Sequence, residues 1–329
     1  MTANLHTRSH TALVADVGGT NARFAIADLN TLLITGSARF RRAEFPSLLA
    51  AIRYYLDGVE DPPTAAALAI AAPIIGATVH FTNSPWLVDI EELRSSLGLD
   101  PFLILNDFEA LAHALPHLRP SDLYQIGGST PVDRATRVVL GPGTGLGIAS
   151  LFWGGTGWLA MASEGGHSSF AAEDAREFAI LERLLIGQER VSVERLVSGP
   201  GLAAVYRIIA ELDGRSVPRL EAPEVVERAL AREDSVAQET LMRFTTWLGR
   251  FAGDAALFFA ARGGVYLGGG IAPRIVDVLS SGGFRRAFEL KGRMAPYVAP
   301  LPCYVITSHE AGLIGAAVAL AGQPPAATA

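Results

Sequence analysis

The sequence has one cysteine, Cys303, among its 329 residues. A single cysteine excludes a disulfide within the chain and any zinc site built from several cysteines, and it is typical of a protein from a reducing cytoplasm. The sequence also lacks a block of basic residues, and its net charge is -6 with a pI of about 5.7. A nucleic-acid-binding surface would need clustered Lys and Arg, so we expect no nucleic-acid partner.

Charged residues are absent from two long stretches, 62–88 and 138–163. Uncharged length alone would suggest membrane spans, but prolines and an Asn-Ser-Pro turn interrupt the first stretch, and glycines interrupt the second. The first ten residues are polar, and Asp16 interrupts the apolar run behind them, so they make a poor signal peptide. We therefore expect buried strands and turns, no membrane association and a cytoplasmic location.

The residues that are present alternate between short apolar runs, glycine-rich turns and amphipathic stretches. Half of the residues are hydrophobic and 18% are charged, as in a well-packed globular protein, and the length is enough for two domains. Hydrophobic spacing and capping residues predict helices over residues 47–56, 89–97, 108–115, 175–186, 202–212, 222–231, 235–261 and 311–320.

The stretch over residues 13–28 has two strand-like runs around a Gly18-Gly19-Thr20-Asn21 turn. Glycines can take positive φ and leave a bare backbone that a ligand can approach closely. The turn suits a phosphate held by backbone N–H groups, with Asp16 placed to hold a cation. An ordinary hairpin fits the same residues about equally well.

Residues 138–153 repeat this plan, with a Gly143-Thr144-Gly145 turn between two apolar runs. The repeat suggests two related halves, each of which contributes one phosphate turn. A third turn, Gly268-Gly269-Gly270, follows a predicted strand at residues 265–267 and leaves room for a nucleotide to lie against the backbone.

Polar residues occur at two other places where they could meet a ligand. Asn106 and Asp107 end an apolar strand over residues 102–105, just before a helix, which is where open α/β sheets place ligands. In isolation, an N-cap of that helix is the favoured role for Asp107.

Glu164 and His167 lie in a polar loop, which could bind a polyol or could be a surface turn. Glu194 comes before a Gly-Pro-Gly turn, and a charged residue there is usually solvated. Together, phosphate turns, a strand-end carboxylate and a polyol-binding loop describe phosphoryl transfer, which needs mainly positioning, charge neutralisation and a base.

In this combination the chain resembles the bacterial glucokinase family, the group without a zinc motif, within the hexokinase and actin-like ATPase superfamily. The segments that carry the resemblance occur in family order along nearly the whole chain: DVGGTNARFAIAD (16–28), AIAAPI (69–74), TNSPW (82–86), LNDFEA (105–110), GPGTGLG (141–147), EGGH (164–167), VERLVSGPGL (193–202) and LGGGIAPR (267–274).

The resemblance implies an α/β fold of two ribonuclease-H-like lobes with an active-site cleft between them. The small lobe would comprise residues 1–117 and 308–329, and the large lobe residues 118–307. It also implies an ATP- and Mg²⁺-dependent kinase that makes glucose 6-phosphate, and a homodimer.

The residue roles that the resemblance implies can be stated one by one. Asp107 would be the catalytic base that accepts the proton of the sugar 6-hydroxyl. The sugar would be bound by Asn106, Asp107, Glu164, His167 and Glu194. ATP would contact Ala15, Asp16, Val17, Gly18, Gly19, Thr20 and Asn21, then Gly143, Thr144 and Gly145, then Gly268, Gly269 and Gly270. Asp16 would meet Mg²⁺ through water.

Three alternatives stay open at this point. The enzyme could act on another hexose, it could use another phosphoryl donor such as polyphosphate, or the chain could be a non-catalytic sugar-sensing regulator. Ser163 stands where the family usually has glycine, which could change the mobility of the Glu164–His167 loop and the affinity for sugar.

Overall fold

The computed structural model describes residues 10–81 and 86–322. The N-terminal residues 1–9 and residues 82–85 of the TNSPW segment lie outside the described residues. The contacts divide the chain into two units: unit 1 is Met1–Leu118 with Ser308–Ala329, and unit 2 is Arg119–Thr307. Each unit is described below by itself.

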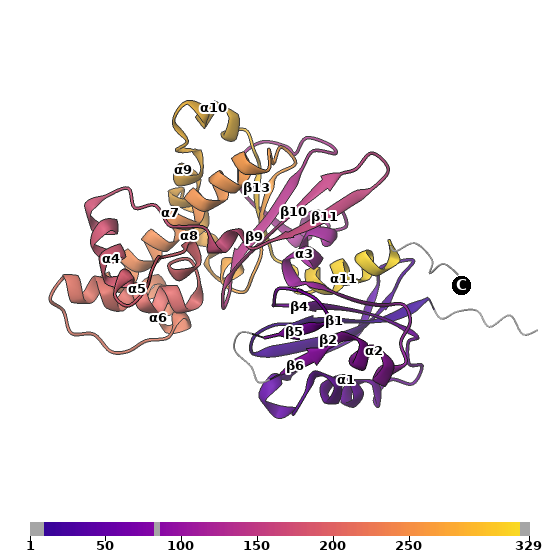
Figure 1. The fold of residues 1–329 in the computed structure, drawn as a ribbon. Coiled ribbons are helices and arrows are strands. Elements are labelled where there is room, and N and C mark those ends of the chain that lie inside the picture. Colours follow the sequence, from indigo (N-terminus) through magenta and orange to yellow (C-terminus); the bar gives the residue numbers. More distant parts are fainter. Residues whose placement is uncertain (1–9, 82–85, 323–329) are drawn as a thin grey trace, which may run out of the picture. The chain divides into compact units, whose positions relative to one another are not determined.

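Unit 1 contains a five-stranded sheet in the order β3-β2-β1-β4-β7 (Figure 1). Strand β2 runs antiparallel to both of its neighbours, β3 and β1, whereas β1, β4 and β7 run parallel to one another. Their bounds are Ile34–Arg41 (β3), Asn21–Asp28 (β2), Thr11–Val17 (β1), Ala65–Ile70 (β4) and Phe102–Asn106 (β7). A short hairpin of β5 (Thr78–His80) and β6 (Leu87–Asp89) completes the strands described in this unit.

Helices cover both faces of this sheet, because successive residues of a buried strand point to opposite sides. Leu13 packs in one core with α1 (Leu48–Leu56) and α2 (Ile90–Leu97), and Val14 packs in another with α3 (Asp107–Ala114) and α11 (Ala311–Ala321). Helix α11 consists largely of small residues and packs tightly on α3, since a Cβ on Gly315 would lie 1.7 Å from the carbonyl oxygen of Ala110.

Unit 2 contains a six-stranded sheet in the order β11-β10-β9-β12-β13-β8. Its first five strands repeat the order and directions of the sheet in unit 1, with an antiparallel hairpin pair followed by parallel neighbours. The prediction of two related halves is therefore confirmed at the level of topology. The bounds are Trp158–Ser163 (β11), Leu146–Trp153 (β10), Arg137–Pro142 (β9), Val265–Leu267 (β12), Cys303–Ile306 (β13) and Leu123–Gly127 (β8).

The long helix α7 (Ser235–Phe258) is the main support of unit 2. Two glycines inside this helix have a packing role: a Cβ on Gly249 or Gly253 would lie 2.2 or 2.4 Å from the carbonyl oxygen of Phe284 or Phe288 on α9. The other helices are α4 (Ala175–Leu185), α5 (Gly199–Leu212), α6 (Ala222–Ala231), α8 (Val276–Ser280), α9 (Gly283–Glu289) and α10 (Ala295–Val298).

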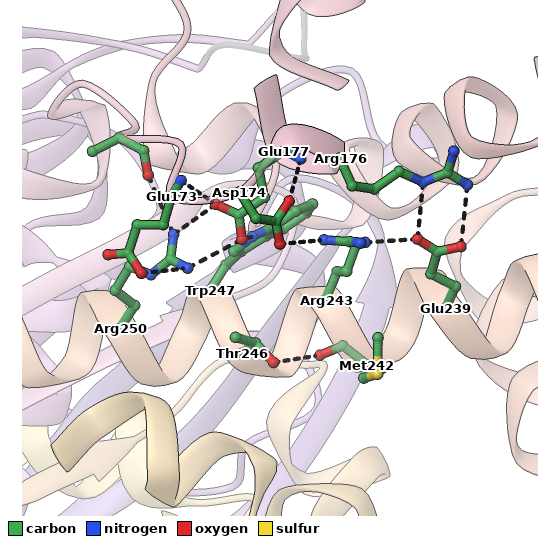
Figure 2. Close-up of polar contacts among 11 residues, drawn as sticks. Glu173, Asp174, Arg176, Glu177, Glu239, Met242, Arg243, Thr246, Trp247 and Arg250 are labelled. Atoms are coloured by element: carbon green, nitrogen blue, oxygen red, sulfur yellow. Dashed lines mark hydrogen bonds and ion pairs between the residues drawn. The ribbon is translucent and has the colours of Figure 1, made fainter. Parts of the chain in front are cut away.

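Charged side chains link α7 to α4 and the segment before it (Figure 2). The carboxylate of Glu177, buried at 3% exposure, accepts from Trp247 Nε1 at 2.8 Å and from both terminal nitrogens of Arg250 at 3.0 Å. Arg243 bonds Asp174 at 3.3 Å and Glu239 at 2.7 Å. These contacts fix α4 and the segment before it against α7.

Most predicted helices and strands lie within a few residues of their observed bounds. One interpretation is wrong: the Gly-Pro-Gly segment is the first turn of α5 and not a turn before it, because Ser198 caps the helix by accepting from the N–H of Gly201 at 3.1 Å. Proline is well tolerated there, since that position has no intrahelical partner for an N–H. In the described part of the chain, no helix is both long and apolar enough to span a membrane.

Candidate active site

The carboxyl ends of three parallel strands bring the predicted residues of unit 1 to one edge of its sheet. Val17 pairs with Ile70, and Ile70 pairs with Asn106, so β1, β4 and β7 end in the same row. The first glycine turn follows β1, and Asn106 and Asp107 end β7 and begin α3. The phosphate-turn candidate and the base candidate therefore lie on the same edge, separated by the end of β4.

Asn106, and not Asp107, is the N-cap of α3. Its Oδ1 accepts from the N–H groups of Phe108 (2.9 Å) and Glu109 (3.3 Å), and its Nδ2 donates to the carbonyl oxygen of Ala72 at 3.4 Å. Asp107 is the first helical residue, so the cap interpretation of Asp107 is wrong. Because Asn106 caps the helix and reaches back toward the end of β4, the backbone at Asp107 is fixed at the sheet edge, and Oδ1 of Asp107 accepts from the N–H of Phe108 at 3.0 Å.

Asp16 carries a partly buried carboxyl group whose charge is only partly balanced. Burial raises the pKa of Asp16, and the nearby charges of Arg23 and Arg39 oppose this shift. Arg23 lies directly across the β1–β2 ladder from Asp16 and donates to the carbonyl oxygen of His309. A Cβ on Gly312 would lie 3.5 Å from the Asp16 carboxyl group, so the start of α11 also borders it. A cation beside Asp16 would offset the cost of burying the carboxylate.

The first glycine turn joins β1 to β2 without a helix, as predicted. The N–H of Gly18 donates to the carbonyl oxygen of Asn21 at 2.9 Å, and Thr20 is exposed at the tip. Gly18 does not adopt positive φ, so the expected need for a left-handed backbone is not the reason for glycine at this position. The absence of a side chain at Gly18 still allows a ligand to approach the backbone closely.

In unit 2, the second glycine turn and the triple-glycine turn lie against each other. They follow the neighbouring parallel strands β9 and β12. A Cβ on Gly141 would lie 2.1 Å from the carbonyl oxygen of Gly268, and one on Gly269, at φ +76°, would lie 2.6 Å from that of Pro142. Only glycines allow these backbones to approach so closely. The contact places residues 143–145 and 268–270 side by side, and Thr144 and Gly270 are exposed.

The structure brings together the three polar residues that sequence alone left as surface candidates. His167 Nε2 lies 3.8 Å from Glu164 Oε2, and His167 Nδ1 lies 3.9 Å from Glu194 Oε1. Glu194 reaches this position because the N–H of Val193 donates to the carbonyl oxygen of Ser168 at 2.9 Å, which fastens the two segments. Half-exposed side chains with several acceptors and a two-sided imidazole suit a ligand with many hydroxyl groups.

Glu194 also connects this polar cluster to the second glycine turn. Its Oε2 accepts from the N–H of Leu146 at 2.8 Å, and a Cβ on Gly145 would lie 2.5 Å from the same oxygen. Gly145 is therefore glycine because a carboxylate lies against it. The expectation that Glu194 would be a solvated surface charge is wrong.

The departure from the family at Ser163 has a defined contact. Its Oγ accepts from the N–H of Gly165 at 3.1 Å, at the start of the loop that carries Glu164 and His167. Gly166 in the same loop packs on β10, since a Cβ there would lie 2.1 Å from the carbonyl oxygen of Leu146. The serine therefore adds a hydrogen bond to a loop whose glycine already fixes its position.

Sequence reasoning missed one residue that contacts the predicted phosphate machinery. Arg42 donates from Nη1 to the carbonyl oxygens of Gly18 (2.8 Å) and Gly19 (3.2 Å). It follows β3, an edge strand whose polar and exposed residues gave no periodic signal. The last residue of that strand, Arg41, and the residue after it, Arg42, differ in burial, which their residue type does not reveal.

Comparison with known proteins gives a consistent result. The glucokinase family model matches residues 13–323. The glucokinase of Tolumonas auensis is 42% identical over 303 residues, covering 92% of this chain and 94% of that protein. The glucokinase of Cronobacter sakazakii is 41% identical, covering 93% and 95%.

Solved structures agree. The crystal structure of a glucokinase from an Antarctic psychrotroph has a TM-score of 0.83 at 36% identity, covering 95% of this chain and 99% of that one. A ROK-family glucokinase from Streptomyces griseus, solved with glucose and AMPPNP, has a TM-score of 0.67 at 20% identity, covering 94% and 99%, and so shares the fold. From its family model, its relatives and its fold, the chain belongs to the glucokinase family and has the α/β fold of the actin-like ATPases.

Proposed function

We propose that this chain transfers the γ-phosphoryl group of ATP to the 6-hydroxyl of glucose and releases glucose 6-phosphate. The observation that carries the proposal is the attachment of a Glu164–His167–Glu194 cluster to the second glycine turn through the Leu146 N–H. A site for a polyol and a site for phosphate are joined there by one carboxylate. Members of the glucokinase family catalyse this phosphoryl transfer, and the residues of this chain supply the parts that it needs.

Asp107 is the proposed base. As the 6-hydroxyl oxygen attacks the γ-phosphorus, the O–H proton passes to the Asp107 carboxylate, and the bond from the γ-phosphorus to the bridging oxygen of ATP breaks. A positioned base commonly contributes on the order of 10²–10⁴-fold to such a step. Asn106 fixes the start of α3 and has an amide group with donors to offer to the sugar.

The remaining polar residues are proposed to select the sugar. Glu164, His167 and Glu194 would accept from and donate to the ring hydroxyls, and a site of this kind rejects sugars that leave its polar groups unpaired. His167 lies between the two carboxylates, and its two nitrogens allow it to bond one carboxylate and the sugar at the same time.

The glycine turns are proposed to hold the nucleotide. Backbone N–H groups of residues 19–21, 144 and 145 would bind phosphate oxygens, since those of Gly18 and Gly143 already donate within their own turns. Residues 268–270 would leave room for the adenosine. Asp16 is the residue that would hold Mg²⁺, through water, which is how Mg²⁺ is usually bound when substrate phosphates supply its other ligands. Bound there, Mg²⁺ would neutralise charge on the polyphosphate.

A cytoplasmic location and a homodimeric state complete the proposal. The single cysteine supports a reducing compartment, since Cys303 is buried and free. The homodimer rests on family membership, and the elution mass of the purified protein tests it.

The test is a coupled kinase assay over a panel of hexoses, with ATP and polyphosphate as donors. We expect the highest kcat/KM for glucose with ATP. A higher kcat/KM for fructose or mannose would show that the enzyme acts on another hexose. A higher kcat/KM for polyphosphate than for ATP would show that it uses another phosphoryl donor. Binding of sugar and ATP without phosphorylation would indicate a sensor.

The Asp107→Asn variant should lose about 10²–10⁴-fold in kcat while still binding glucose, and Glu109→Gln on the same helix is the matched control. Near-normal kcat in Asp107→Asn would disprove the base assignment.

A further inference from the structure

Arg42 lies directly behind the first glycine turn. The antiparallel β2–β3 ladder pairs Asn21 with Arg41, which brings the next residue beside the turn. The backbone N–H of Arg42 donates to the carbonyl oxygen of Thr20 at 3.0 Å. Its Nη1 donates to the carbonyl oxygens of Gly18 at 2.8 Å and Gly19 at 3.2 Å. One residue thus binds three consecutive carbonyl groups of the turn.

These bonds determine where the N–H groups of the turn point. In a planar trans peptide the C=O and the next N–H point in opposite directions. Because the carbonyl groups of residues 18–20 face Arg42, the N–H groups of Gly19, Thr20 and Asn21 face away from it. Successive N–H groups with a common direction form a concave anion site. The bond to Thr20 comes from the backbone and survives a substitution, but without the Arg42 side chain the peptide units that follow Gly18 and Gly19 could rotate and present a carbonyl oxygen, which repels phosphate.

The guanidinium group is also a buried charge with little compensation. Arg42 is 4% exposed and lies between the rings of Phe81 and Trp86, at 4.0 and 4.5 Å from their centroids. Its Nε and Nη2 have no hydrogen-bond partner, and no salt bridge of Arg42 occurs, among residues 10–81 and 86–322. Burial lowers the pKa of Arg42, yet a guanidinium stays charged in proteins. A cation held in a medium of low dielectric constant attracts an anion at the turn more strongly than a solvated one would.

We propose that Arg42 is a positioning residue for the phosphoryl donor: it orders the first glycine turn from behind and supplies positive charge to the polyphosphate that the turn binds. The inference rests on the proposed role of that turn in ATP binding. It differs from a purely structural role, in which Arg42 would only fill the space between two aromatic rings. The two roles predict different effects on ATP and glucose.

The test compares Arg42→Met with Arg41→Met, a matched control at the adjacent, exposed position. Loss of hydrogen bonds from a charged group should raise KM for ATP, and Kd for AMPPNP measured without sugar, by about tenfold or more. KM for glucose should stay within about twofold, and Arg41→Met should resemble the wild type in every constant. A lower melting temperature with unchanged Kd for AMPPNP would overturn the proposal and leave only the structural role.

Arg42→Lys provides the second variant, and it decides the question if the methionine variant does not fold. Lysine keeps the charge and can donate to a carbonyl oxygen, but it cannot form the planar stack between the rings. We expect its Kd for AMPPNP to lie between those of the wild type and Arg42→Met. Equal rises in KM for ATP and for glucose would overturn the proposal. Wild-type protein that binds AMPPNP but does not phosphorylate glucose would refute the proposed function alone, because the binding comparison does not depend on turnover.

Discussion

The substitution Gly145→Ala should impair glucose binding, although Gly145 belongs to the turn that is proposed to hold phosphate. The added Cβ would lie 2.5 Å from Glu194 Oε2, closer than atoms can pack, and 3.3 Å from its Cδ. Gly145 does not have positive φ, so alanine brings no backbone strain and the effect comes from this contact alone. The carboxylate must move, and its hydrogen bond from the Leu146 N–H at 2.8 Å is then lost.

Two magnitudes follow from that displacement. A backbone N–H left without an acceptor at Leu146, which is 4% exposed, costs about 1–3 kcal/mol of folding free energy. In a domain of this size the melting temperature should therefore fall by roughly 2–12 °C. In the proposed site, moving Glu194 also removes its hydrogen bond to the sugar, and such a bond to a charged group is worth about 1.5–3 kcal/mol, which corresponds to about a 10- to 150-fold higher KM for glucose.

Steady-state kinetics with each substrate varied in turn, together with thermal melting, would measure both effects. Gly157→Ala is the matched control, because a Cβ at Gly157 meets nothing within 4 Å and its φ is not positive. The control should keep the wild-type constants. If Gly145→Ala raised KM for ATP while KM for glucose and the melting temperature stayed at the wild-type values, the assignment of Glu194 as the link between the turn and the sugar cluster would be wrong.

Two further predictions concern unit 2. Removing the buried carboxylate in Glu177→Ala should destabilise the unit by about 3–5 kcal/mol, because Trp247 loses its acceptor and Arg250 keeps only the exposed one of its two carboxylate partners, Glu173. Burial alone would raise the pKa of the Glu177 carboxyl group, but hydrogen bonds from Arg250, Trp247 and a backbone N–H outweigh it and lower the pKa below its ordinary value. The stabilisation is therefore present above the unfolded pKa and lost as the pH falls through the folded one. Urea melts at neutral and acid pH should show the difference between wild type and variant shrinking in acid, and a constant difference would contradict this. Burial raises the pKa of the Cys303 thiol to about 12, so a thiol reagent at mildly alkaline pH should label it only after unfolding, and rapid labelling of the folded protein would contradict its burial.

Local patterns in the sequence were enough to predict the elements that carry the glycine turns. Each hairpin has two apolar strands around a short turn, and such strands are specified by residues close together in the chain. The same holds for α2, where Asp89 caps the helix by accepting from the N–H of Glu92 at 2.9 Å and Gly98 ends it at φ +65°. These features depend on neighbours within a few residues, so the sequence states them directly.

Contacts between distant segments could not be predicted in this way. Glu194 lies against Gly145 because a separate pairing, between residues 168 and 193, brings its segment to the turn. Arg42 lies against Gly18 because β3 pairs with β2. Residue type gives no information on such placement: Arg41 is exposed and Arg42 is buried, although both are arginines at the end of one strand.

The two glycine turns have the same local form but different supports, and this difference determines what each can control. The first turn is held by a cation, since Arg42 binds its carbonyl groups and contributes a positive charge that an anion would feel. The second turn is held by an anion, since Glu194 accepts from the Leu146 N–H at its end and also lies beside His167 in the cluster that is proposed to bind the sugar. A change behind the first turn should therefore weaken the nucleotide alone, whereas a change in the second should reach the sugar. The two units share the order of five strands, but the side chains that hold their glycine turns, Arg42 and Glu194, come from segments outside the two hairpins.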